Sequence, residues 1–152
     1  MQMKPTYLLL TLWLLLGACS SENERLILDV PSLRGKSPSE VVGMLGEPDS
    51  TQTKLLMGRR AYIQLYDRHG IELKYHEGKL SSVIVNNTED LPFEPGIITR
   101  FGFTMAPPTF QDSTSFFNWS DLDSVSYISI SKSGMRTEDP EKVDFKVFFT
   151  ME

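Results

Sequence analysis

The stretch that decides the fold is 60-RAYIQLYDRHGIELKYHEGKLSSVIV-85. Three segments rich in β-branched and aromatic residues, 60–66, 71–75 and 80–85, are separated by two short polar stretches, DRHG at 67–70 and HEGK at 76–79. Polar turn residues that include a glycine, placed between apolar segments, are the sequence signal of a β-hairpin. The stretch therefore predicts three strands in an antiparallel meander.

A short helix is expected before this meander. Ser37 is a good N-cap, Pro38 suits the first helical position, and Glu40 completes a capping box. Gly46 ends the helix and Pro48 prevents its continuation. We expect Gly46 to have a positive φ. The apolar segment 26–30 could form a short first strand.

The second half of the chain repeats this order. A helix is expected through 97–101, ended by Gly102, and is followed by strand segments at 115–119, 125–131 and 142–149. The two halves are weakly similar at a period of about 55–60 residues. One interpretation is an internal duplication, and the alternative is a coincidence that any α+β domain offers.

The expected fold class is α+β, a helix followed by an antiparallel β-meander, with two such modules packed in tandem. The expected boundaries are a signal peptide at 1–18, a tether at 19–36, a first module at 37–87 and a second module at 88–152.

The N-terminus carries a targeting signal. Lys4 precedes an apolar run at 7–16, and Leu16-Gly17-Ala18-Cys19 follows. The run is shorter than the ~20 residues that a membrane-spanning helix needs, and its length suits a signal peptide. The pattern resembles the lipobox of bacterial lipoproteins, which implies cleavage before Cys19 and lipid on its sulfur. Cys19 is the only cysteine.

The lipobox resemblance implies a place in the cell envelope. We expect the membrane to be one partner, through lipidated Cys19. The outer membrane is the expected location, because Ser20 rather than aspartate follows the cysteine, by the sorting rule of enteric bacteria. The net charge of −5 disfavours nucleic acid as a partner.

Four motifs resemble known small lipoproteins. Gly35-Lys36-Ser37, Val42-x-x-Leu45-Gly46-x-Pro48, the aromatic strand at 62–66 and Gly78-Lys79-Leu80-x-x-Val83 are similar to BamE/SmpA-type outer-membrane lipoproteins and to the tandem modules of the β-lactamase-inhibitory-protein fold. The resemblance covers about 50 residues and implies a fold more than a function. A single-module BamE has no counterpart of the second half, which argues against a role in outer-membrane protein assembly.

Catalytic motifs are scarce. The sequence has no Gly-x-Ser-x-Gly, no phosphate-binding loop and no His-Glu-x-x-His. His69 and His76 lie at opposite ends of one expected strand, too far apart to share a metal. Asp121 and Asp123 could hold a cation, but Asp-x-Asp before serine is more often a turn or a cap. We expect no catalytic residue, no cofactor and no metal.

Aromatic residues are the candidates for binding a protein. On the expected strand 61–66, Tyr62 and Tyr66 should point away from Ile63 and Leu65. If the latter pair faces the helix, the tyrosines face solvent or the second half of the chain. Tyr62, Tyr66 and Trp119 are therefore candidate partner-binding residues, and the alternative is that the two halves simply pack there.

Three Asp-Ser pairs mark candidate modification sites. They resemble the O-glycosylation acceptor pattern of Bacteroidetes envelope proteins, which would place glycans on Ser50, Ser113 and Ser124. The alternative is ordinary turn chemistry.

The sequence thus predicts a membrane-anchored envelope lipoprotein that acts as a protein-binding or scaffold module. One alternative is an inhibitor or immunity-type protein that blocks an enzyme through its sheet face. A small-molecule or glycan-handling enzyme is the less favoured alternative.

Overall fold

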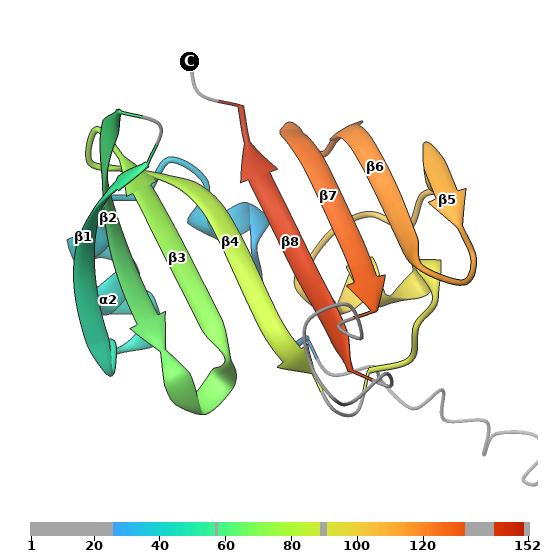
Figure 1. The fold of residues 1–152 in the computed structure, drawn as a ribbon, viewed down its shortest axis with the longest axis horizontal. Coiled ribbons are helices and arrows are strands. Elements are labelled where there is room, and N and C mark those ends of the chain that lie inside the picture. The colour runs from blue at the N-terminus through green and yellow to red at the C-terminus, as the bar shows by residue number, and fades with distance from the viewer. Residues whose placement is uncertain (1–25, 57, 89–90, 133–141, 151–152) are drawn as a thin grey trace, which may run out of the picture.

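The structure, a computed structural model, describes residues 26–56, 58–88, 91–132 and 142–150. Its strands form one eight-stranded antiparallel sheet in the order β1-β2-β3-β4-β8-β7-β6-β5 (Figure 1). The first four strands therefore form one half of the sheet and the last four form the other. The halves meet at the centre, where β4 pairs with β8.

The strands and helical segments have the following bounds. The strands are β1 (Ser50–Leu56), β2 (Arg59–Tyr66), β3 (Ile71–His76), β4 (Lys79–Thr88), β5 (Phe110–Asp112), β6 (Phe116–Leu122), β7 (Val125–Lys132) and β8 (Val143–Phe149). The α-helix in the described residues is α2 (Pro38–Leu45), and three 3-10 segments are η1 (Pro31–Leu33), η2 (Asp67–His69) and η3 (Pro95–Phe101).

The expected α+β class is wrong, because the fold is mainly β. The helical signals at 38–45 and 97–101 were real but give short segments, and the second of these is a 3-10 helix. Two strands, β1 and β5, were missed. Both lie at sheet edges and are largely exposed, so neither shows the alternation of apolar and polar residues that marks a half-buried strand.

The segment 26–30 is not a strand. It runs beside η3, where the Ile27 N–H donates to the Arg100 carbonyl at 2.7 Å and the Val30 N–H donates to the Phe101 carbonyl at 3.1 Å. Two of its apolar residues, Leu28 and Val30, are buried and belong to the core.

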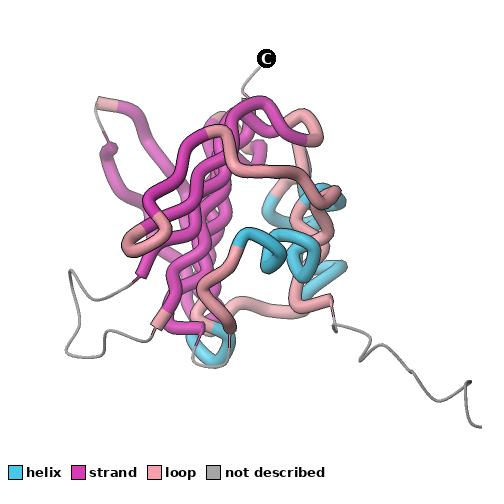
Figure 2. Tube along the Cα trace, turned by 90° about the vertical axis from the view of Figure 1, so that its right-hand side faces the viewer, coloured by secondary structure: helices cyan, strands magenta, loops and turns pink. Residues whose placement is uncertain are grey.

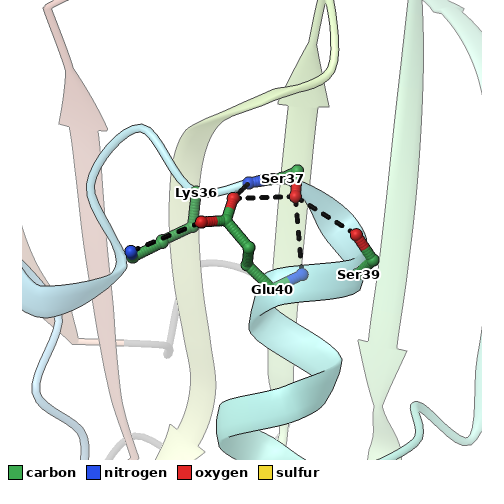
Figure 3. Close-up of polar contacts among 4 residues, drawn as sticks. All are labelled: Lys36, Ser37, Ser39 and Glu40. Carbon is green, nitrogen blue, oxygen red and sulfur yellow. Dashed lines mark hydrogen bonds and ion pairs between the residues drawn. The ribbon is translucent and has the colours of Figure 1, made fainter.

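The signals that begin and end α2 are confirmed. The Ser37 Oγ accepts a hydrogen bond from the Glu40 N–H at 3.4 Å, and a carboxylate oxygen of Glu40 accepts one from the Ser37 N–H at 2.8 Å (Figure 3). These hydrogen bonds from Ser37 lower the pKa of the Glu40 carboxyl, with a smaller contribution from Lys36. Gly46 follows the helix with φ 87° and ψ −176°, a conformation that is essentially restricted to glycine.

Two-residue turns set the register of two hairpins. Glu77 and Gly78 have φ values of 52° and 78° between the paired residues His76 and Lys79. Asp123 and Ser124 have φ values of 49° and 65° between β6 and β7. Positive φ at both central residues suits a type I′ turn, whose twist matches that of paired strands.

All the helical segments named above except the β2–β3 connection η2 pack against one face of the sheet, as Figure 2 shows. Leu33 of η1, Val41 of α2 and Phe101 of η3 belong to the same buried cluster as the inward residues of β3, β4, β6, β7 and β8. Phe101 stacks on Phe145 of β8 with ring centroids 3.7 Å apart. One continuous core therefore underlies both halves of the sheet.

Candidate protein-binding face

Among the described residues, no helix lies over the other face of the sheet. Strand register places side chains on this face in two rows that cross the sheet, which we call the helix-free face. One row is Gln52, Ile63, Lys74, Ser82, Phe148, Tyr127 and Ser120; the next is Ser50, Leu65, Glu72, Ile84, Lys146, Ser129, Asn118 and Phe110. The residues between these rows, including Leu73, Val83 and Val147, point into the core on the opposite side.

This placement corrects the expected orientation of β2. Tyr66 is buried on the helix-covered side, and its hydroxyl donates to the Gly46 carbonyl at 3.1 Å. Tyr62 is half-buried on that same side and packs against Tyr75, with centroids 5.9 Å apart. Ile63 and Leu65 instead belong to the helix-free face. Both faces of β2 carry apolar residues, so the sequence pattern did not distinguish them.

Trp119 is also a core residue rather than a surface one. Its ring is almost fully buried, and its indole Nε1–H donates to the Ala106 carbonyl at 2.9 Å. Buried tryptophan usually has such a partner for its N–H. Tyr66 and Trp119 therefore stabilise the fold and offer no free surface to a partner.

The half of the helix-free face formed by β5–β8 is rich in exposed aromatic rings. Phe110 is 64% exposed and stacks on Phe116 with centroids 5.6 Å apart. Phe148 is 41% exposed and packs against Tyr127 at 6.2 Å. We call these four residues the aromatic half of the face. Aromatic side chains are enriched at protein–protein interfaces, where they bury large areas at a small cost in conformational entropy.

Asn118 lies between these rings. It is opposite Phe110 on one side and Ser129 on the other. Its Oδ1 is buried and has no hydrogen-bond partner among the described residues. Buried polar atoms in folded proteins are nearly always paired, so this oxygen is an exception within the described residues. The sequence did not predict this feature of Asn118, because no sequence pattern indicates that a buried side-chain oxygen will lack a hydrogen-bond partner.

The half formed by β1–β4 is more highly charged. Lys74 pairs with Glu72 at 3.1 Å, and both side chains are partly buried. Ile63 and Ile84 are buried on this half without any helix above them; each is flanked in its row by longer side chains from the neighbouring strands. On this half Leu56 is 41% exposed at the end of β1, whereas the aromatic half exposes two rings, Phe110 and Phe148.

The three serines of the Asp-Ser pairs are exposed. Ser50 begins β1, Ser113 lies in the β5–β6 turn and Ser124 in the β6–β7 turn. Each preceding aspartate has a contact of its own. An Asp112 carboxylate oxygen accepts from the Thr114 N–H at 2.9 Å, as in an Asx turn, and the hydrogen bonds from Thr114 lower the pKa of Asp112. An Asp123 oxygen accepts from the Thr104 N–H, 19 residues away, at 2.7 Å, and Asp49 pairs with Arg68 at 3.6 Å. Glycosylation of the serines stays a prediction.

A small cleft of about 180 Å³ opens near the β3–β4 turn. It is lined by Arg34, His76, Glu77, Lys79 and the end of β8. Its volume is below the ~300 Å³ at which pockets for drug-sized ligands begin. Within the part of the chain that the structure describes, no three His, Cys, Asp or Glu residues gather as metal ligands.

The lipidation site Cys19 lies outside the described residues. Among the helices that are described, none is long and apolar enough to cross a membrane. Comparison with known proteins finds no matching family model, curated protein or solved structure. The resemblance to BamE/SmpA and to the β-lactamase-inhibitory-protein fold therefore stays a prediction.

Proposed function

We propose that this chain is a lipid-anchored protein of the bacterial cell envelope that binds another protein through the aromatic half of its helix-free face. The support for the anchor is the Leu16-Gly17-Ala18-Cys19 pattern behind a short apolar run. The support for protein binding is the exposure of Phe110 and Phe148 on a face that no element of the described chain covers.

The aromatic half has the composition of an interface centre. Its rings surround a set of short polar side chains, Asn118, Ser120 and Ser129, that can exchange hydrogen bonds with a partner's backbone. Lys146 and the charged residues of β1–β3 lie beside the aromatic half, on its β4 side. This is the position that the polar rim of an interface would occupy. A partner that presents an apolar side chain to Phe110 and Phe148 and a hydrogen-bonding group to exposed Ser120 fits this surface.

The test is affinity capture of the intact lipoprotein from cross-linked membranes, followed by capture with variants. Phe148→Ala and Phe110→Ala should each weaken binding of the captured protein by about 2 kcal/mol or more if they are interface hot spots. Met44→Ala is the matched control, because Met44 is also an exposed apolar residue but lies on α2, on the other side of the sheet. Equal capture by all three variants would contradict the proposal.

The inhibitor or immunity-type alternative would use the same surface. It differs only in what the partner does: if the captured protein is an enzyme, its activity should fall when the purified chain is added, and Phe148→Ala should restore that activity. A partner without such inhibition leaves the scaffold role as the better description.

A further inference from the structure

Three exposed apolar side chains lie on the opposite side of the molecule from the aromatic half. Met105 is 63% exposed, Leu26 is 56% exposed, and Ile27 is also exposed. We call these three residues the η3 patch. Exposed apolar side chains that gather around one short element are candidates for a contact with a protein or a membrane.

The patch surrounds η3. The Ile27 N–H donates to the Arg100 carbonyl at 2.7 Å, which holds Leu26 and Ile27 at the C-terminal end of the segment. The Met105 methyl lies 3.3 Å from the position that a Cβ on Gly96 would occupy, so Met105 covers the N-terminal end. Figure 2 shows that the described chain begins on this helix-covered side of the sheet.

The distance to the proposed anchor is short. Leu26 is seven residues after Cys19, and a fully extended chain spans at most ~3.6 Å per residue, so the two Cα atoms are at most about 25 Å apart. A folded domain of about 125 residues has a radius of gyration of about 14 Å, which for a sphere means a diameter of about 36 Å, and this exceeds the length of the tether. The side from which the chain emerges is the side that the tether keeps nearest to the bilayer.

The charges near the patch indicate which kind of lipid surface it suits. Arg100 lies on η3, and Glu94 and Asp29 lie at its two ends. The described surroundings thus mix both signs and have no cluster of lysine and arginine, which is what attraction to anionic lipid requires. An apolar contact with zwitterionic phospholipid is the better match.

We propose, on the basis of the lipid anchor in the proposed function, that the η3 patch rests on the phospholipid surface that holds acylated Cys19. The aromatic half then faces away from the bilayer, where a protein partner can reach it. The lipid anchor holds the chain on the membrane, and the patch adds a second contact that sets its orientation.

The test uses the lipidated protein, purified from membranes and reconstituted into phosphatidylcholine vesicles. Acylation removes the only native thiol, so Met105→Cys and Phe110→Cys each offer a single site for a polarity-sensitive fluorophore. The two positions are matched in exposure, at 63% and 64%, but lie on opposite sides of the sheet. We expect a blue-shifted emission and quenching by lipid-borne quenchers at 105 and neither effect at 110.

Two outcomes would overturn the inference: an unquenched probe at 105, or equal quenching at both positions. If the labelled Met105→Cys protein melts at a lower temperature than wild type, Leu26→Cys provides the same measurement at the other end of η3. Failure of the anchor itself is distinguishable, because an unlipidated protein would not float with the vesicles and its Cys19 thiol would react with the label.

Discussion

The two faces of the sheet use similar side chains for different purposes. On β8, Phe145 points into the core and stacks on Phe101 at 3.7 Å, while Phe148 points the other way and is 41% exposed. The same contrast holds on β6, where Trp119 is buried and Asn118 and Phe116 lie on the helix-free face. Residue type therefore does not decide whether a ring is buried or exposed. Among the described residues the helical layer decides it, because that layer covers one face of the sheet.

The largest expected effect separates Phe145 from Phe148, two of the three phenylalanines of β8. Phe145→Ala should destabilise the protein by about 3–5 kcal/mol, because it removes a fully buried ring and leaves a cavity. Phe148→Ala should change stability by less than about 1 kcal/mol, because the side chain is 41% exposed and lies outside the buried cluster, with a ring contact to Tyr127. Urea denaturation of both variants measures the difference. Similar losses would mean that the helix-free face is covered in the folded protein.

A smaller effect is expected where α2 ends. Gly46→Val should destabilise by about 1–3 kcal/mol, because a β-branched residue is strained at φ 87°, ψ −176°. Gly43 lies in the middle of α2 with no atom near its would-be Cβ, so Gly43→Ala should stabilise by roughly 0.5–1 kcal/mol. Thermal unfolding of the two variants measures both changes in stability. An unchanged stability of Gly46→Val would contradict the backbone conformation assigned to Gly46.

The smallest effect concerns the capping box that begins α2. The pKa of Glu40 is lowered in the folded state by hydrogen bonds from Ser37, so its contribution to stability is present above the ordinary carboxyl pKa of 4.5 and is lost as pH falls through the lower folded value. Glu40→Gln should therefore melt below wild type at pH 7, and the gap should narrow in acid. The comparison is a set of melting curves from pH 7 to pH 3. A gap that is independent of pH would rule out the ionised carboxylate as its source.

The candidate site was only partly predictable. Sequence reasoning chose aromatic residues of the strands as the binding surface, and aromatic residues do gather on the helix-free face, but it chose Tyr62, Tyr66 and Trp119 and missed Phe110 and Phe148. Alternation assigns residues to two faces without saying which face is covered. Two hydrogen bonds show that α2 packs over the tyrosine side of β2. The Tyr66 hydroxyl donates to the Gly46 carbonyl, and the Gln64 side chain donates to the Pro38 carbonyl at 3.3 Å.

The sequence by itself determined the features that a few neighbouring residues control. Ser37 and Glu40 cap α2, Gly46 ends it, and the turns at 67–70 and 76–79 separate the strands β2, β3 and β4. These signals are local because a cap or a two-residue turn depends on the φ and ψ preferences and hydrogen bonds of adjacent residues. The tertiary structure alone decided that β1 and β5 form the sheet edges, that β4 pairs with β8, and that helices cover one face of the sheet. Those features depend on pairing and packing between residues far apart in the chain, which no local pattern of apolar residues specifies.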